Sequence, residues 1–197
     1  MAVLHLGAVG FTDLKTEERV KNFPSTLHAR ISRIADVTGV DYSSTVIEEL
    51  KKIGIRNLIF GNAERLEELE LNRTFDLIVV GDLIEHLANP GLMLQGLGRF
   101  CHKDTQIIIT TPNAFGLAGM IRYLTGHFRE GEEHVMCFNI YNIRNLLNRY
   151  RFQVISEATC HQDKAASLGL LFRMGKGIFR LFPRLGGTLF LVVRPYY

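Results

Sequence analysis

The sequence predicts an α/β fold in which a mostly parallel β-sheet is covered by helices on both faces. Three observations lead to this prediction. Apolar runs of strand length alternate along the chain with amphipathic segments of helix length. One run, residues 75–81 (FDLIVVG), is apolar almost throughout, which is typical of a central strand buried on both faces. The 197 residues are 47% hydrophobic, so the chain can bury a substantial core as one domain.

Seven segments have the length and composition of strands. They are residues 2–6, 35–41, 56–62, 75–81, 106–113, 152–160 and 187–195. Pro112 closes the fifth of them, because proline cannot donate to the hydrogen-bond ladder of a sheet. We expect the last strand to run antiparallel, which is an expectation about the fold and not a result of periodicity.

Helical segments separate these strands. They are residues 14–23 and 27–35, interrupted at Pro24, and then 42–54, 91–100, 139–150 and 166–182. Residues 42–54 begin with Ser and Thr, carry Lys late and end at Gly54, so both ends suit a helix. Asn89 and Pro90 are expected to be the N-cap and first turn of the next helix. Residues 113–138 are glycine-rich, and we expect them to form an inserted loop region within a single domain of residues 1–197.

Composition and charge narrow the function classes. The formal net charge of +3 is too weak to indicate nucleic acid as a partner, and no basic stripe with interleaved aromatics is present. Three cysteines without paired spacing favour reduced thiols and a cytoplasmic location. We find no signal peptide and no membrane span. Residues 168–184 carry basic side chains at helical spacing, which indicates either a helix packed on the sheet, the favoured interpretation, or peripheral contact with an anionic membrane.

Polar and small residues follow the predicted strands at the edge where ligands of open α/β sheets bind. They are Gly7, Ala8, Val9, Asp41, Asn62, Ala63, Gly81, Asp82, Glu85, His86 and Asn113. A G-x-G-x-x-G dinucleotide motif would need glycine at positions 7, 9 and 12, but Val9 and Thr12 stand there, which argues against a nicotinamide-dependent dehydrogenase. Asp41 can accept hydrogen bonds from both hydroxyls of a ribose, and a role as a helix-capping or turn aspartate is equally compatible.

The order of these motifs resembles the class I S-adenosylmethionine-dependent methyltransferases. The resemblance is carried by LHLGAVG, VTGVDYSSTVIEELKKIG, GNAERL, FDLIVVGDLIEHLANPGLML, IIITTPN and EHVMCFNIYNIRNLLNRYRFQVI, and it covers nearly the whole chain. It is similar to members that act in surface-polysaccharide and small-molecule biosynthesis. The resemblance implies a Rossmann-like seven-stranded sheet with S-adenosylmethionine bound over the loop after the first strand.

The resemblance also assigns cofactor-binding residues. It implies that Gly7, Ala8 and Val9 face the methionine part, that Asp41 binds the ribose with Tyr42 beside it, that Asn62 and Ala63 contact the adenine, and that Gly81, Asp82 and Leu83 lie near the sulfonium. The family's first loop usually reads G-x-G-x-G, whereas Val9 and Phe11 replace two of these glycines here. Members of the family often carry helices before the first strand that cover the cofactor. Either residues 11–26 take this place or the site is open.

Two histidines are candidate catalytic residues. A hydroxyl acceptor needs a base, and the pKa of histidine, about 6.5, leaves His86 largely neutral at pH 7. His134 is a second candidate base, and a structural role is the alternative for both. Glu85 is interpreted as structural. No second His/Cys pair accompanies His134 and Cys137, so we expect no metal.

The sequence therefore predicts a methyltransferase that uses S-adenosylmethionine. The expected acceptor is an oxygen, with nitrogen as the second choice, of a small molecule or glycan precursor. The alternative is a catalytically inactive methyltransferase-like module that binds a ligand or a protein partner. Cofactor binding separates the two.

Overall fold

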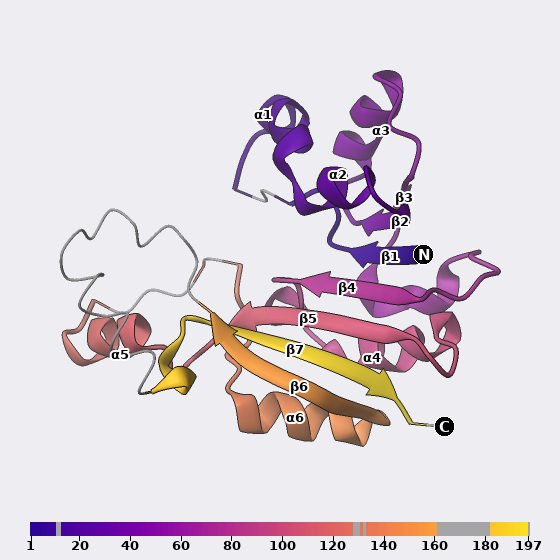
Figure 1. Cartoon of the computed structure of the whole chain (residues 1–197). Coiled ribbons are helices and arrows are strands. Elements are labelled where there is room, and N and C mark those ends of the chain that lie inside the picture. The colour runs from indigo at the N-terminus through magenta and orange to yellow at the C-terminus, as the bar shows by residue number, and fades with distance from the viewer. Residues whose placement is uncertain (11–12, 128–130, 132, 161–181, 197) are drawn as a thin grey trace.

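A seven-stranded sheet organises the chain. The computed structural model describes residues 1–10, 13–127, 131, 133–160 and 182–196. The strands lie in the order β3-β2-β1-β4-β5-β7-β6, and β7 runs antiparallel to both of its neighbours (Figure 1). The other pairs are parallel. The strands are β1 (Ala2–Leu6), β2 (Asp36–Asp41), β3 (Leu58–Phe60), β4 (Leu77–Gly81), β5 (Gln106–Pro112), β6 (Phe152–Cys160) and β7 (Thr188–Pro195). The predicted fold class and antiparallel last strand are confirmed.

Helices and short 3-10 turns connect the strands. The α-helices are α1 (Thr16–Asn22), α2 (Leu27–Ile31), α3 (Ser44–Lys52), α4 (Pro90–Leu97), α5 (Leu117–Leu124) and α6 (Ile140–Arg149). The 3-10 turns that matter here are η1 (Phe23–Ser25), η2 (Ala63–Glu68) and η3 (Ile84–His86). Pro24 lies in η1, so the break between the first two predicted helices is where the sequence placed it.

Alternating side chains of the strands bury two faces. Leu4 and Leu6 of β1 lie in the main hydrophobic cluster, together with β4, β5 and β7 and with the apolar sides of α4 and α6. Val3 points the other way and packs with Val37, Val79 and the partly buried Ile31 of α2. This period of two places helices on both faces of the sheet, as a central parallel strand requires.

Of three expectations about local structure, one needs correction, one is confirmed in position, and one lies almost wholly outside the described residues. Residues 113–138 are not wholly irregular, because α5 forms inside them. Asn89 is the N-cap of α4, but its side chain makes no capping bond, and its backbone N–H donates to Glu64 instead. The predicted helix 166–182 lies outside the described residues except for Phe182, so the packing or membrane role of the basic segment 168–184 stays a prediction.

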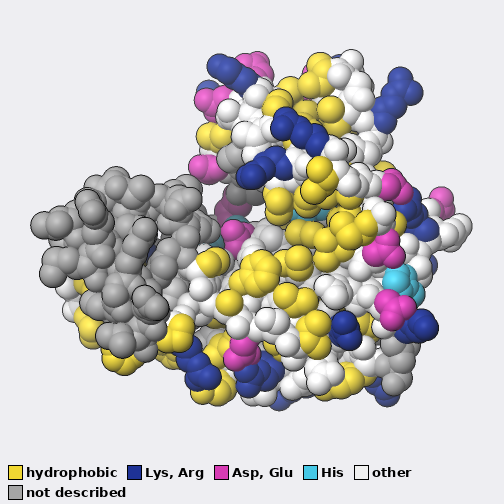
Figure 2. Space-filling view, in the orientation of Figure 1, with side chains coloured by type: hydrophobic (Ala, Val, Ile, Leu, Met, Phe, Trp, Pro, Cys, Tyr) yellow, Lys and Arg dark blue, Asp and Glu magenta, His cyan; other side chains and the backbone are white. Residues whose placement is uncertain are grey.

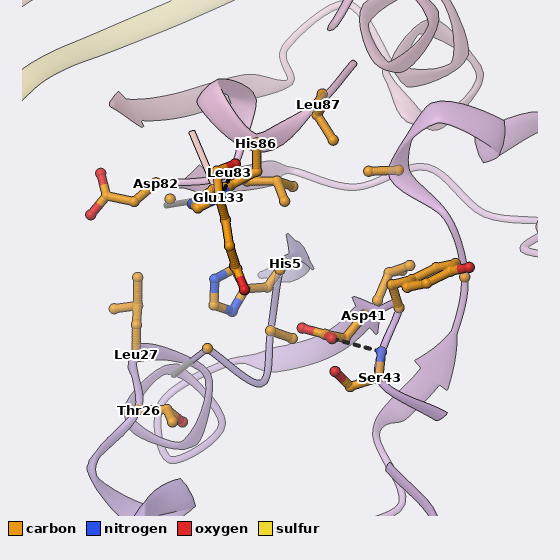
Figure 3. Close-up of a pocket in the computed structure, with 18 of the residues that line it drawn as sticks. His5, Thr26, Leu27, Asp41, Ser43, Asp82, Leu83, His86, Leu87 and Glu133 are labelled. Atoms are coloured by element: carbon orange, nitrogen blue, oxygen red, sulfur yellow. Dashed lines mark hydrogen bonds and ion pairs between the residues drawn. The ribbon is translucent and has the colours of Figure 1, made fainter. Parts of the chain in front are cut away.

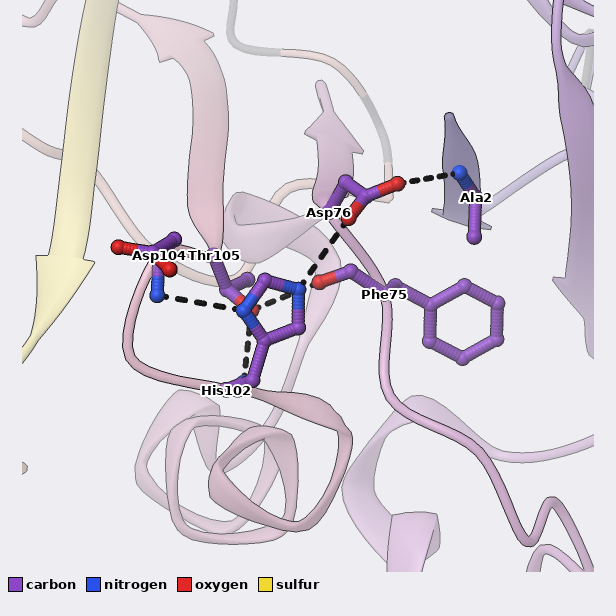
Figure 4. Close-up of polar contacts among 6 residues, drawn as sticks. All are labelled: Ala2, Phe75, Asp76, His102, Asp104 and Thr105. Atoms are coloured by element: carbon purple, nitrogen blue, oxygen red, sulfur yellow. Dashed lines mark hydrogen bonds and ion pairs between the residues drawn. The ribbon is translucent and has the colours of Figure 1, made fainter.

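A polar network ties the amino ends of the central strands together (Figure 4). The Asp76 carboxylate accepts from the Ala2 N–H at 2.7 Å and lies 3.3 Å from His102 Nε2. The Thr105 hydroxyl donates to the Phe75 carbonyl. The bond from Ala2 lowers the pKa of Asp76, with a smaller contribution from His102. These contacts join β1, β4 and the loop before β5 at the edge of the sheet opposite the loops that follow the strands. In the described part of the chain, no helix is long and apolar enough to cross a membrane.

Candidate functional site

A pocket of about 890 Å³ opens at the carboxyl ends of β1, β2 and β4. β1 lies between β2 and β4, so the order of strands reverses there, which is where open α/β sheets bind ligands. Figure 2 shows a hollow between the part of the molecule that carries α1 and α3 and the part below it. The lining residues are His5, Gly7, Ala8, Gly10, Asp13, Ser25, Thr26, Leu27, Val40, Asp41, Tyr42, Ser43, Gly61, Asn62, Ala63, Glu64, Gly81, Asp82, Leu83, His86, Leu87, Thr110 and Glu133.

The loop after β1 brings backbone to the pocket. Gly7 and Gly10 have positive φ angles of 72° and 62°, which glycine adopts without strain. A side chain built on Gly7 would also contact Leu83, whose Cδ1 would lie 3.5 Å from the new carbon. Val9 is placed differently from its neighbours. Its side chain is fully buried in the cluster with α3, and its N–H points to Asp41.

Asp41 closes the second strand and joins two loops. Its Oδ2 accepts from the Val9 N–H at 2.9 Å, and its Oδ1 accepts from the Ser43 N–H at 3.0 Å (Figure 3). An ionised carboxylate has about four acceptor positions, so each oxygen keeps capacity for one ligand hydroxyl. Ser43, not Asp41, is the N-cap of α3, so Asp41 has the structural role of a turn aspartate, and this role is compatible with the predicted ribose role. Tyr42 lines the pocket beside it, with its ring 5.7 Å from that of Phe60.

Asn62 and Ala63 follow β3 at the pocket wall. Asn62 is the N-cap of η2, and its Oδ1 accepts from the Glu64 N–H at 2.8 Å. An amide oxygen has two lone pairs, so it can accept one further bond from a ligand amine. The capping bond fixes the Asn62 Oδ1 in place and leaves its second lone pair available to a ligand.

The turn after β4 is held in a rare backbone conformation. Asp82 has φ = 45°, in the left-handed region that side chains seldom adopt. Its N–H donates to the Thr110 carbonyl at 3.0 Å, and its carboxylate accepts from the Thr110 hydroxyl at 3.0 Å. Gly81, Asp82 and Leu83 all line the pocket. Thr110 on β5 thus fixes the turn that faces the ligand.

The segment before α2 forms another wall of the pocket. Asp13, Ser25, Thr26 and Leu27 line it. The Thr26 hydroxyl accepts from the Ala29 N–H and donates to the Phe23 carbonyl, which fixes the start of α2. Of the two alternatives for residues 11–26, these contacts favour the one in which the segment contributes to the site; residues 11 and 12 lie outside the described part.

Acidic side chains dominate the charge of the pocket. Five carboxylates line it, and no lysine or arginine does so among the described residues. The acidic residues are Asp13, Asp41, Glu64, Asp82 and Glu133. Such a lining favours a ligand that carries positive charge.

Glu85, His86 and His134 meet at one end of this pocket. Each offers a donor atom, and the three atoms lie within 4.8 Å of one another. The rings of His86 and His134 are in edge contact, with centroids 4.8 Å apart. His86 lines the pocket, whereas His134 lies behind it and does not. The two predicted catalytic histidines are thus brought together although they lie 48 positions apart in the sequence.

Backbone contacts hold this group. The Glu85 carbonyl accepts from the N–H groups of Val135 and Met136, at 3.0 and 3.1 Å. His86 Nδ1 lies 3.1 Å from the carbonyl of Glu133, which also lines the pocket. The segment that carries His134 is therefore fastened to η3 at three points.

Glu85 is the residue of this group whose importance the sequence analysis missed. It is 1% exposed, and its Oε2 accepts from the Thr111 hydroxyl at 2.9 Å. Its Oε1 is buried without a hydrogen-bond partner among the described residues. Burial raises the pKa of Glu85 to about 7, against the opposing effect of the bond from Thr111. No signal in the sequence reveals this burial, since Glu85 follows directly after a turn.

A second histidine pair lies at the pocket wall, where His5 lines the pocket and His28 does not. His5 of β1 and His28 of α2 stack with ring centroids 5.6 Å apart. Burial lowers the pKa of His5 to about 3, with His28 contributing, and burial also lowers the pKa of His28. A Cβ on Gly39, the partner of His5 in β2, would lie 2.5 Å from His28 Cε1, so glycine makes room for this ring.

Comparison with known proteins agrees with this geometry. Residues 18–157 match the family model described as a methyltransferase domain. The chain belongs to this methyltransferase family. No curated protein matches the sequence.

Solved structures share the methyltransferase fold at low sequence identity. A SAM-dependent methyltransferase from Archaeoglobus fulgidus is 15% identical, with a TM-score of 0.60 over 98% of this chain and 85% of that one. A possible histamine N-methyltransferase from Thermotoga maritima is 13% identical, with a TM-score of 0.65 over 99% and 82%. Magnesium protoporphyrin IX methyltransferase from Synechocystis PCC 6803 with bound SAH is 12% identical, with a TM-score of 0.60 over 98% and 74%.

The methyltransferase domain uses S-adenosylmethionine, and the pocket fits this cofactor. S-adenosylmethionine carries a sulfonium, which suits a lining with five carboxylates and no lysine or arginine among the described residues. The free acceptor positions of Asp41 and Asn62 suit a ribose and an adenine amine, respectively. Ten of the twelve residues predicted to bind cofactor or catalyse lie on the pocket wall, all except Val9 and His134.

Proposed function

We propose that this methyltransferase transfers the methyl group to an oxygen of a small molecule, glycan precursors included. The Glu85–His86–His134 group carries this proposal, because it places proton-accepting side chains at the wall of the cofactor pocket. A hydroxyl must lose its proton to become a good nucleophile, whereas a neutral amine already has its lone pair. Such a group therefore favours an oxygen acceptor over a nitrogen acceptor.

The chemistry follows from this arrangement. S-adenosylmethionine, when bound here, would supply the methyl group to the acceptor oxygen, and its sulfur would keep the electron pair of the broken carbon–sulfur bond. The hydroxyl proton leaves to the Glu85–His86–His134 group, of which His86 lies on the pocket wall. Asp41, Asn62 and the Gly81–Leu83 turn orient the cofactor. The reaction needs the two centres in line at roughly 3 to 3.5 Å.

Pocket size supports a small acceptor. At about 890 Å³ the pocket lies near the upper end of the roughly 300 to 1,000 Å³ usual for small-molecule sites, which leaves room beside the cofactor. The cysteine pattern supports the cytoplasm as the place of action.

The test uses S-adenosylmethionine labelled with ¹³C in the methyl group. The chain is incubated with matched pairs of small acceptors that carry either a hydroxyl or an amine on the same scaffold, sugars included. Carbon NMR distinguishes O-methyl from N-methyl products. O-methyl products would support the proposal, and products methylated only on nitrogen would contradict it.

A further inference from the structure

We propose that Glu85, His86 and His134 form a binding site for a divalent metal ion of the zinc type. The sequence led us to expect no metal, since His134 and Cys137 have no second pair of ligands nearby in the sequence. The fold supplies the other two ligands, Glu85 and His86, from η3, which is distant from His134 in the sequence. One carboxylate and two imidazoles are a donor set that holds zinc in sites with an open coordination position.

The distances are compatible with such a site. The three donor atoms lie within 4.8 Å of one another. Donors of a four-coordinate zinc lie roughly 3.4 Å apart, given zinc–ligand distances of about 2.0 to 2.1 Å. The donor atoms therefore need to approach one another by up to about 1.4 Å, which rotamer adjustment of two imidazoles can supply.

Glu85 gives an independent indication of a ligand. Its Oε1 is buried and lacks a hydrogen-bond partner among the described residues, although the side chain is 1% exposed. An unpaired buried carboxylate oxygen is costly, and coordination to a cation removes this cost. Thr111 donates to the other oxygen at 2.9 Å, which is the kind of outer contact that fixes a ligating carboxylate.

The environment of His86 points the same way. Its Nδ1 lies 3.1 Å from the Glu133 carbonyl, and because a carbonyl only accepts, a neutral His86 must carry its proton on Nδ1. Nε2 then keeps the lone pair that a metal needs. Metal-binding histidines usually donate their other N–H to a carbonyl or carboxylate in this manner.

A cation here would explain how the acceptor is activated. His86 and Glu133 line the cofactor pocket, so the open coordination position would face the acceptor. A bound divalent cation lowers the pKa of a coordinated hydroxyl, which then releases its proton to water. The role of the metal in activating the acceptor rests on the proposed function, and in this role His86 is a metal ligand instead of the base. Metal binding itself can be measured without any acceptor.

The test is titration of the chelator-treated full chain with ZnCl₂ in competition with a chromogenic zinc chelator. The wild-type chain should bind one zinc ion. Glu85→Gln and His134→Ala should each lower zinc affinity by more than the roughly 10- to 100-fold expected for loss of an outer contact. His102→Ala is the matched control, since His102 also lies beside a carboxylate, at 3.3 Å from Asp76, and is similarly exposed. Its zinc affinity should equal that of the wild type.

Two results would overturn the inference. One is the absence of competitive zinc binding by wild-type chain that melts cooperatively. The other is unchanged zinc affinity in Glu85→Gln and His134→Ala. If Glu85→Gln does not fold, His134→Ala decides, because His134 is only partly buried. Zinc binding without methyl transfer to any hydroxyl acceptor would refute the proposed function and leave the metal site intact. Methyl transfer unaffected by chelation would refute the role of the metal in activating the acceptor, and the zinc titration would still decide whether the site exists.

Discussion

The buried pair of His5 and His28 predicts that the domain loses stability in mild acid. Burial lowers the pKa of His5 to about 3, from an ordinary value near 6.5. Between pH 3 and pH 6.5, His5 therefore binds a proton in the unfolded chain but not in the folded chain. The free energy of unfolding is unaffected by His5 above pH 6.5 and falls as the pH drops below this value. The groups that face His5 and His28 include Asp41, which raises the pKa of His28 against the larger effect of burial.

The size of the effect follows from the depressed pKa. At pH 5 the pH lies about 1.5 units below the pKa of His5 in the unfolded chain. Protonation of His5 therefore stabilises the unfolded state by about 2 kcal/mol. For a domain of this size, this corresponds to a fall in melting temperature of roughly 4 to 8 °C. His5→Phe keeps a ring that can stack on His28 but does not titrate, so this part of the pH dependence should disappear.

The assay is urea unfolding of wild-type chain and His5→Phe at pH 7.5 and pH 5. The control is His127→Gln, which replaces an exposed histidine and should retain the wild-type dependence on pH. An equal loss of stability in His5→Phe and wild type would refute the argument that His5 is buried in its neutral form.

Three further predictions concern the pocket and its support. Asp41→Ala should weaken S-adenosylmethionine binding by about 1 to 3 kcal/mol through loss of ribose hydrogen bonds, and an unchanged dissociation constant in calorimetry would exclude the assignment. His86→Ala should lower kcat far more than cofactor affinity, and normal turnover of an identified acceptor would remove its role. Gly39→Ala should destabilise the fold by about 1 to 3 kcal/mol, because its Cβ would lie 2.5 Å from both His28 and Leu58; chemical unfolding that matches wild type would contradict this.

Much of the fold could be predicted because strand signals are local. The apolar run before Gly81 and the short, mostly apolar run at residues 2–6 identify buried strands without knowledge of their neighbours. The helix α5 was missed although Leu117, Met120, Ile121 and Leu124 have helical spacing, because the glycines around them dominated the interpretation.

Only the site residues that directly follow strands could be predicted from the sequence. Asp41 and the Gly81–Leu83 turn follow strands and line the pocket. The Glu85–His86–His134 group depends on bonds between η3 and residues 135 and 136, far apart in the sequence. The His5–His28 stack likewise depends on packing of α2 on β1 and on the absence of a side chain at Gly39. Neither pairing has a signature in a single sequence.

Binding of the cofactor is the measurement that tests the account most directly. Isothermal titration of the purified, cofactor-free chain with S-adenosylmethionine and, separately, with S-adenosylhomocysteine should give one site with a dissociation constant in the micromolar range. The Asp41→Ala chain should bind both ligands more weakly. No binding of either ligand by wild-type chain that unfolds cooperatively would contradict the account and favour a methyltransferase-like module without catalysis.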